Sequence, residues 1–493
     1  MGARQLRASV PGIRELGAAA AAAALTALLG YAGVHKLGAA GLLVPVALVL
    51  VCILVLRPLF TVALVVALVV VCEGPQFGLL TFTANLYNPL YGDISLVDGL
   101  VALALVAVGI DLLRHRRALL LPRPLVLGLA LLALAMVAGA VTGYDAGAKL
   151  RFAIASEHVL LYLLLLPIAV ANLAIDRPTV LRLLGGATAL AIVKAVLGLV
   201  EVAGHYGSPI EGATTLTYLE PTANWLIMVA LLGILAAVLA RARPPLWTLL
   251  SSPLLIACLV FSYRRSFWIG AALGLLLVLL LGTSTSGRRL LLPAALGVAG
   301  AILLLGSINF QSQLPIVKRV ASLAPSKLEA NVQDSYRLDE RANVLQAIGE
   351  HPLTGLGMTI PWAADARVLS VEHEEGRQYV HFAALWFWLK LGILGLLAYV
   401  AVLIGAMTLA WQVWRGSREP LLSAFGLASL CALAGLVAIE TTASFTGVDP
   451  RFTALLGAQM GLLGLLRMTA SESRPPAGGG QAGARSEISA SIE

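Results

Sequence analysis

Charged residues are scarce in this chain. Of its 493 residues only 12% are Asp, Glu, Lys or Arg, whereas soluble domains carry about 25%. Hydrophobic residues make up 59% of the chain. This composition argues against a soluble fold and against a disordered or fibrous chain. Since one membrane crossing takes about 20 residues, the apolar residues suffice for about fourteen crossings and leave little sequence for a second, soluble domain.

Cysteine is rare, and several well-known catalytic motifs are missing. The four cysteines lie in or at the ends of apolar runs and form no CxxC pair, so a disulfide framework or a zinc site is not indicated. The chain has no GxxxxGK[ST] phosphate-binding loop, no HExxH zinc motif and no GxSxG nucleophile turn. These absences exclude a P-loop ATPase and give no support to a zinc protease or a serine hydrolase.

Long apolar runs cover most of the chain and predict membrane-spanning helices. The runs are 18–34, 40–56, 58–73, 96–113, 124–142, 153–172, 183–204, 222–240, 247–262, 267–282, 290–308, 381–409, 421–439 and 452–467. Arg57 alone separates the second run from the third, so these two could form one hairpin. The first run follows Arg4, Arg7 and Arg14, an arrangement that suits either an Ala-rich first span or a cleaved signal peptide.

Basic residues are distributed unevenly between alternate loops. With the N-terminus inside, nineteen lie in the inner loops and termini, and six lie in the short outer loops. Cytoplasmic loops of membrane proteins carry such an excess. The net charge of +8 is therefore explained by topology and does not indicate nucleic acid binding. Residues 468–493 are rich in Gly, Pro and Ser, and we expect a disordered cytoplasmic tail there.

The segment 309–380 is a long polar connection on the predicted outer side. It divides the chain into eleven spans over 1–308, an extracytoplasmic loop with short helices, and three spans over 381–467. Long connections without secondary structure are usually functional or disordered. Because Ser335–Glu350 has a helical pattern, we expect this loop to be folded and the outer face to carry the function.

Two arginines on the predicted outer face run against the charge rule. Arg264 and Arg265 lie in the tight hairpin Ser262–Ser266 between two spans. An anionic ligand would stabilise their charge. The alternative is that their side chains reach lipid phosphates at the membrane surface.

Further candidates lie in the long loop and at its end. Arg337 and Arg341 precede the sequence His351-Pro352-Leu-Thr-Gly-Leu-Gly, in which Pro and two glycines end a helix and allow a tight backbone path. His381 opens a span at the predicted outer mouth, where a histidine can titrate near neutral pH. The alternative is an interfacial histidine within an aromatic belt.

The spacing of these residues resembles that of the O-antigen ligase and polymerase superfamily, bacterial membrane enzymes that move lipid-linked glycans. Members carry an Arg, then a Pro fifteen residues later, then two glycines. Arg337, Pro352, Gly355 and Gly357 lie at this spacing.

A second pattern of the family concerns the span that follows the loop. Members have a His at its start, an apolar residue four positions later and a Gly eleven positions later, as at His381, Leu385 and Gly392. Arg265 is similar to the arginine of the family's Ser-Arg hairpin, and Asn224 to an asparagine at the start of another span. The chain departs from the usual residues at Phe382, Lys390 and Arg341.

The resemblance implies an all-α, polytopic transmembrane bundle of about 12 to 14 spans, similar to the GT-C class, with one long extracytoplasmic loop. It implies a multi-pass enzyme of the bacterial cytoplasmic membrane that transfers a glycan from a polyprenyl diphosphate carrier to a glycan or lipid-glycan acceptor. The transfer would be inverting, with no metal or other cofactor. The implied catalytic base is His381, the implied diphosphate ligands are Arg265, Arg337, Arg264 and Arg341, and Pro352, Gly355 and Gly357 would shape the loop.

Other interpretations remain open at this point. His351 and His373 are competing histidines in the loop, the first at a helix end and the second in an acidic segment. A transporter or flippase of lipid-linked sugars would suit the ionisable residues within spans, namely Glu157, His158, Lys194 and Glu201. A non-catalytic assembly subunit is a third reading. Within the enzyme class, the sequence does not separate a ligase from a polymerase.

Overall fold

The structure is a computed structural model of the whole chain. It describes residues 43–72, 94–149, 157–204, 220–282, 332–367 and 376–472, together with 83, 86, 89–91 and 151–152. The apolar runs 18–34 and 290–308, His373 and the tail 473–493 lie outside the described residues.

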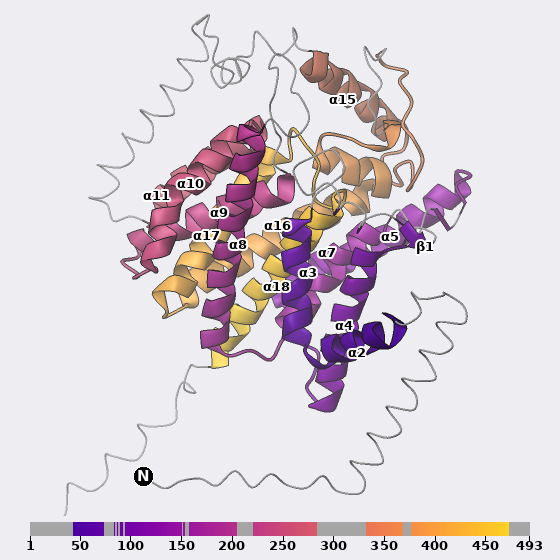
Figure 1. Cartoon of the computed structure of the whole chain (residues 1–493). Coiled ribbons are helices and arrows are strands. Elements are labelled where there is room, and N and C mark those ends of the chain that lie inside the picture. Colours follow the sequence, from indigo (N-terminus) through magenta and orange to yellow (C-terminus); the bar gives the residue numbers. More distant parts are fainter. Residues whose placement is uncertain are drawn as a thin grey trace, which may run out of the picture.

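Helices dominate the described part of the chain (Figure 1). The first half contains α2 (Leu43–Leu56), α3 (Pro58–Val71), α4 (Leu96–Arg114), α5 (Arg123–Asp145), α7 (His158–Ala171), α8 (Arg177–Ala203) and α9 (Pro221–Leu239). The second half contains α10 (Leu246–Phe261), α11 (Arg265–Gly282), α15 (Val332–Glu350), a short 3-10 helix η3 (Gly376–Gln378), α16 (Ala383–Gly416), α17 (Pro420–Ile439) and α18 (Pro450–Glu472). Two short antiparallel strands, β1 (Pro89–Tyr91) and β2 (Ile94–Ser95), precede α4.

Apart from the two undescribed runs, each predicted apolar run overlaps a helix. Among the described residues, seven helices are long and apolar enough to cross a membrane, and the bent pair 45–56 and 58–71 would make eight. This pair is bent by 109° next to Arg57, and α7 and α10 are shorter apolar helices. The protein is therefore a polytopic helical membrane protein, as the composition predicted, and the total of 12 to 14 spans stays a prediction.

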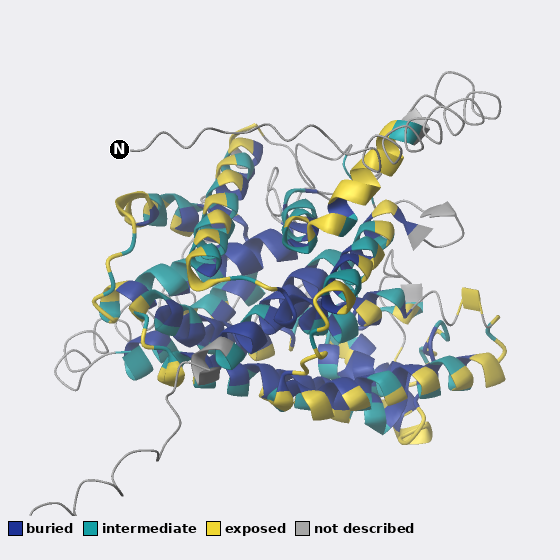
Figure 2. Ribbon diagram, turned by 90° about the horizontal axis from the view of Figure 1, so that it is seen from below, coloured by how far each residue is buried: buried dark blue, intermediate teal, exposed yellow. Residues whose placement is uncertain are grey.

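Large apolar side chains cover the outside of the bundle. Leu127, Leu134 and Val137 of α5 are each at least 60% exposed, and Figure 2 shows exposed residues along the periphery around a buried centre. Exposed apolar area of this extent is unfavourable in water but not in hydrocarbon. This surface is therefore suited to contact with the lipid bilayer.

Small residues allow the central helices to approach closely. A Cβ atom at Gly270 of α11 would lie 2.9 Å from the carbonyl oxygen of Gly435 in α17, and one at Gly461 of α18 would lie 2.7 Å from that of Pro167 in α7. Such contacts drive helix association in membranes, where apolar burial contributes little. α16 lies at the centre of this packing, against α5, α17 and α18.

The helix α16 is broken at Gly392, whose φ of 67° and ψ of −165° are not helical. The loop after α15 fits into this break. Leu356 N donates to Leu389 O at 2.7 Å, and Ile393 N donates to Leu353 O at 3.2 Å. The loop therefore forms hydrogen bonds with backbone groups that an unbroken helix would pair internally, and it fixes the first two turns of α16 next to α15.

Candidate functional site

His381 lies just before α16, at the end of the bundle that carries α15; we call this end the α15 end (Figure 1). Its Nδ1 atom lies 3.0 Å from Oε2 and 3.2 Å from Oε1 of Glu340 in α15, and its backbone N–H donates to Glu340 Oε2 at 3.0 Å. The side chains are 12% and 3% exposed. The rings of Tyr379 and Tyr336 meet the imidazole edge-on, at centroid distances of 4.8 and 6.0 Å.

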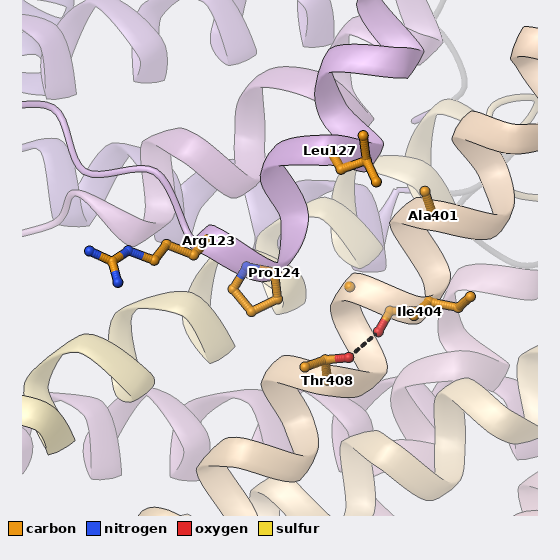
Figure 3. Close-up of a pocket in the computed structure, with 7 residues that line it drawn as sticks. Arg123, Pro124, Leu127, Ala401, Ile404 and Thr408 are labelled. Atoms are coloured by element: carbon orange, nitrogen blue, oxygen red, sulfur yellow. Dashed lines mark hydrogen bonds between the residues drawn. The ribbon is translucent and has the colours of Figure 1, made fainter.

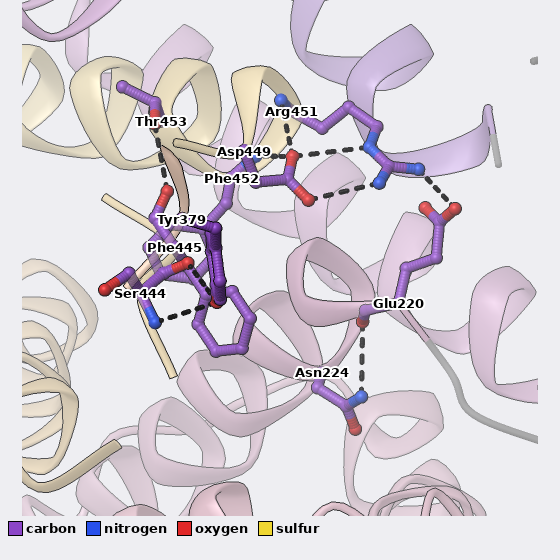
Figure 4. Close-up of polar contacts among 9 residues, drawn as sticks. All are labelled: Glu220, Asn224, Tyr379, Ser444, Phe445, Asp449, Arg451, Phe452 and Thr453. Carbon is purple, nitrogen blue, oxygen red and sulfur yellow. Dashed lines mark hydrogen bonds and ion pairs between the residues drawn. The ribbon is translucent and has the colours of Figure 1, made fainter. Parts of the chain in front are cut away.

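The connection between α17 and α18 supports the backbone on both sides of His381. Ala383 N donates to Glu440 O at 3.0 Å, and the Ser444 hydroxyl donates to Val380 O at 2.6 Å. The Tyr379 hydroxyl lies 3.2 Å from both the backbone N and O of Ser444 (Figure 4). These bonds hold the backbone around His381 against the connection between α17 and α18.

Two of the predicted arginines stack on aromatic rings near this point. Arg341 of α15 lies over the ring of Phe382, with its Cζ atom 6.0 Å from the ring centroid. Arg264 lies over Phe445, at 5.8 Å, and Phe445 follows the serine that binds Tyr379. Arg341 is therefore stacked on the residue after His381, and Arg264 on the residue after Ser444, which contacts Tyr379.

The other two predicted arginines lie next to the first two in the chain: Arg265 follows Arg264, and Arg337 is in α15 with Arg341. Arg265 is the first residue of α11, and Arg337 lies one turn before Glu340 in α15. Burial raises the pKa of Tyr263 in the same hairpin above its usual value. Tyr263 therefore stays neutral at physiological pH, and the ionised groups of the hairpin are its arginines.

The Pro-Gly-Gly segment forms the loop that enters the break in α16. The carbonyl of Pro352 accepts a 2.8 Å hydrogen bond from the Trp388 indole. Gly355 has φ of 67° and Gly357 has φ of 87°. A Cβ at Gly355 would lie 2.8 Å from Gly392 N, and one at Gly357 would clash with the backbone of Gly143 in α5. Both the backbone conformation and the close approach require glycine at these two positions.

A buried ionic cluster lies nearby that the sequence did not reveal. Arg451 of α18 binds Glu220, the residue before α9, and its Nη2 atom lies 3.1 Å from Asp449 Oδ2 (Figure 4). The Asp449 carboxylate also accepts hydrogen bonds from the backbone N–H groups of Arg451 and Phe452. Asp449 therefore caps α18 and at the same time holds the guanidinium that reaches α9.

The remaining candidates lie elsewhere in the bundle. Glu157 precedes α7, Lys194 and Glu201 lie in α8, and all three are buried; His158 lies 3.8 Å from Asp98. His351 is exposed directly after α15. Within the described ranges no group of three or more His, Cys, Asp or Glu side chains could hold a metal ion.

A pocket of about 450 Å³ opens between the start of α5 and the second half of α16 (Figure 3). Its lining includes Arg123, Pro124, Leu127, Ala401, Ile404 and Thr408. It lies beyond the Gly392 break, toward the opposite end of α16 from His381. None of the predicted site residues lines it, so it is separate from the candidate site.

The family comparison matches residues 250–400 to the O-antigen ligase family. These residues are similar to that family, and the match supports the resemblance to the O-antigen ligase and polymerase superfamily. The matched region contains the arginine hairpin, α15, the Pro-Gly-Gly loop and His381. The match indicates an O-antigen ligase-like, glycosyl-transferring role in glycan assembly and implies lipid-linked glycan substrates; together with the apolar helices it suggests a multi-pass bacterial membrane protein. No curated protein matches the chain.

Proposed function

We propose that the protein transfers a glycan from a polyprenyl diphosphate carrier to an acceptor hydroxyl at the outer face of the cytoplasmic membrane. The observation that carries this proposal is the position of His381 at the start of a span. Arginines of α15 and of the α10–α11 hairpin stack on the aromatic residues Phe382 and Phe445. This arrangement offers a proton acceptor and fixed positive charge at the depth of a lipid headgroup.

The chemistry follows from the two kinds of side chain. The acceptor oxygen forms a bond to the anomeric carbon, the bond from that carbon to the diphosphate oxygen breaks, and the hydroxyl proton passes to His381. Attack opposite the leaving group inverts the configuration. Arg265, Arg337, Arg264 and Arg341 stabilise the diphosphate, because a guanidinium binds phosphate oxygens with two parallel hydrogen bonds and keeps its charge. These steps need no metal ion.

A deletion strain tests the reaction class. Loss of a transferase leaves the lipid-linked glycan at the outer face, whereas loss of a flippase leaves it at the inner face. An impermeant glycosidase applied to spheroplasts distinguishes the two, because it digests only the outer pool. Digestion in the deletion strain supports the proposal, and protection of the accumulated glycan contradicts it.

The envelope product of the same strain separates ligase from polymerase. Loss of a ligase leaves the acceptor without glycan, whereas loss of a polymerase leaves single repeating units on it. Complementation with wild type, but not with His381→Ala, should restore the product in either case.

The side of the membrane is tested by cysteine labelling. In a background without native cysteines, Leu353→Cys, which is 73% exposed at the α15 end, should react with an impermeant thiol reagent from outside. Arg116→Cys, in the α4–α5 connection, should react only after permeabilisation. Labelling of position 116 in intact cells would reverse the proposed topology.

A further inference from the structure

Glu340 is a buried carboxylate that contacts His381 through both of its oxygen atoms. Its Oε2 atom lies 3.0 Å from both the backbone N and the Nδ1 atom of His381, and its Oε1 atom lies 3.2 Å from Nδ1. The side chain is only 3% exposed. Burial of a carboxylate is costly unless it is hydrogen-bonded, so this geometry joins α15 firmly to the start of α16.

We propose that Glu340 is the positioning residue of His381: it holds Nδ1 protonated, so that the lone pair of the neutral ring is on Nε2, and it stabilises the imidazolium that forms when Nε2 takes the acceptor proton. This role rests on the proposed function. The proton leaves Nε2 to water after the glycan has been transferred. A histidine with one nitrogen bound to a carboxylate has a defined tautomer and a defined ring plane.

Other polar groups lie on the neighbouring elements. The rings of Tyr336 in α15 and of Tyr379 meet the imidazole edge-on, and Arg337 and Arg341 lie in the same helix as Glu340. From α17, Glu440 contributes its backbone carbonyl to Ala383, while its carboxylate accepts from the Tyr399 hydroxyl at 2.6 Å and from Thr446 N at 2.7 Å. Glu340 contacts the imidazole ring with its carboxylate.

The contact between Glu340 and His381 makes the orientation of His381 depend on the position of α15. Asn343, three residues after Glu340, accepts from Ala366 N and Arg367 N at 2.8 and 2.9 Å. Trp362 then joins this segment to Tyr379, because its indole donates to Tyr379 O at 3.1 Å. Since Glu340 is on α15, His381 is oriented only while α15 is docked on α16.

The test uses the full-length protein in proteoliposomes and compares Glu340→Gln with wild type. The amide keeps an oxygen that can accept from Nδ1–H but removes the charge. Diethyl pyrocarbonate acylates the unprotonated imidazole, so its rate at His381, followed by peptide mass spectrometry across pH, gives the midpoint of the ring's titration. Loss of a contacting negative charge should move this midpoint down by about one to three pH units.

Turnover is measured on the same samples with an undecaprenyl diphosphate-linked oligosaccharide as donor. Glu340→Gln should lower kcat by about 10- to 100-fold, with donor KM changed less than threefold, and the acid limb of the kcat profile should follow the shifted midpoint. Glu340→Asp should recover part of the loss. The matched control is Glu350→Gln in the same helix, where the exposed carboxylate accepts from Gln346; it should behave as wild type.

Two results would overturn the proposal in distinguishable ways. If the midpoint and kcat of Glu340→Gln equal those of Glu350→Gln while His381→Ala is inactive, Glu340 does not position the base. If instead His381→Ala transfers glycan at the wild-type rate, the base assignment fails and the role of Glu340 fails with it. Because Gln has nearly the same shape as Glu, the comparison stays informative even if Glu340→Ala does not fold.

Discussion

Two buried carboxylates at the α15 end have different cationic partners. Glu340 contacts His381, and Glu220 contacts Arg451. An arginine stays charged at every physiological pH, whereas a histidine gains and loses its proton near neutrality. The Glu220–Arg451–Asp449 cluster therefore suits a permanent connection between α9 and α18, while the Glu340–His381 pair suits proton transfer.

Removal of His381 should have the largest effect. His381→Ala should lower turnover by about two to four powers of ten, the usual contribution of general acid–base catalysis, with donor binding largely retained. Turnover and donor KM in proteoliposomes check this expectation. His351→Ala is the control, because His351 is exposed at the end of α15. Wild-type turnover in His381→Ala combined with loss in His351→Ala would assign the base to the loop.

Removal of Arg451 should affect stability. Arg451→Met removes the cationic partner of Glu220, which is buried, and of Asp449, which is half-buried. Breaking a buried pair in this way costs about 3–5 kcal/mol. Thermal unfolding in detergent should show the loss, while the pH midpoint of the surviving activity stays at the wild-type value. Arg418→Ala, at an exposed position before α17, should leave the unfolding temperature unchanged. An unaltered unfolding temperature for Arg451→Met would contradict the structural role of this cluster.

Arginines assigned to the diphosphate should act on donor binding as well as on rate. A hydrogen bond to a charged group contributes about 1.5–3 kcal/mol, which corresponds to roughly 10- to 100-fold in kcat/KM. Arg265→Ala and Arg337→Ala should show at least this loss, and Arg264→Ala and Arg341→Ala less. Arg337→Lys should recover little, since a point charge lacks the planar fork. Full activity in Arg337→Ala would show that Arg337 does not bind the diphosphate.

Substitution in the Pro-Gly-Gly loop, which enters the break in α16, should act through the docking of α15. Gly355→Ala places a Cβ at φ of 67° and against the broken part of α16, and a left-handed conformation costs a non-glycine residue about 1–2 kcal/mol. Turnover should fall together with the protection of α15 backbone amides in hydrogen exchange. Gly349→Ala is the matched control, because a Cβ there meets no atom within 4 Å. If hydrogen exchange of the α15 amides is unchanged in Gly355→Ala, the loop does not control the docking of α15.

Much of the fold could be predicted from hydrophobic runs alone, since every described run overlaps a helix with ends displaced by a few residues. Helical periodicity also predicted the loop helix, which is α15. The sequence did not predict that α16 is broken at Gly392, because a single glycine within an apolar run does not by itself end a helix. It did not predict the two strands before α4 either.

Only part of the candidate site could be predicted from the sequence. His381, the arginines and the glycines stood out because polar or special residues interrupt apolar patterns. Their partners did not, because Glu340 is 41 residues from His381 and Glu220 is 231 residues from Arg451 along the chain. One signal for Glu340 was available: it lies three residues after Arg337, on the same helix face.

The most direct test of the account measures the fate of the carrier. Reconstituted protein would receive a donor with separate labels on the glycan and on the undecaprenyl diphosphate, together with acceptor. The account predicts one free undecaprenyl diphosphate for each glycan transferred by the wild type, and neither product above background from His381→Ala. Movement of the intact donor across the bilayer with both labels still joined would contradict it and would indicate a transporter.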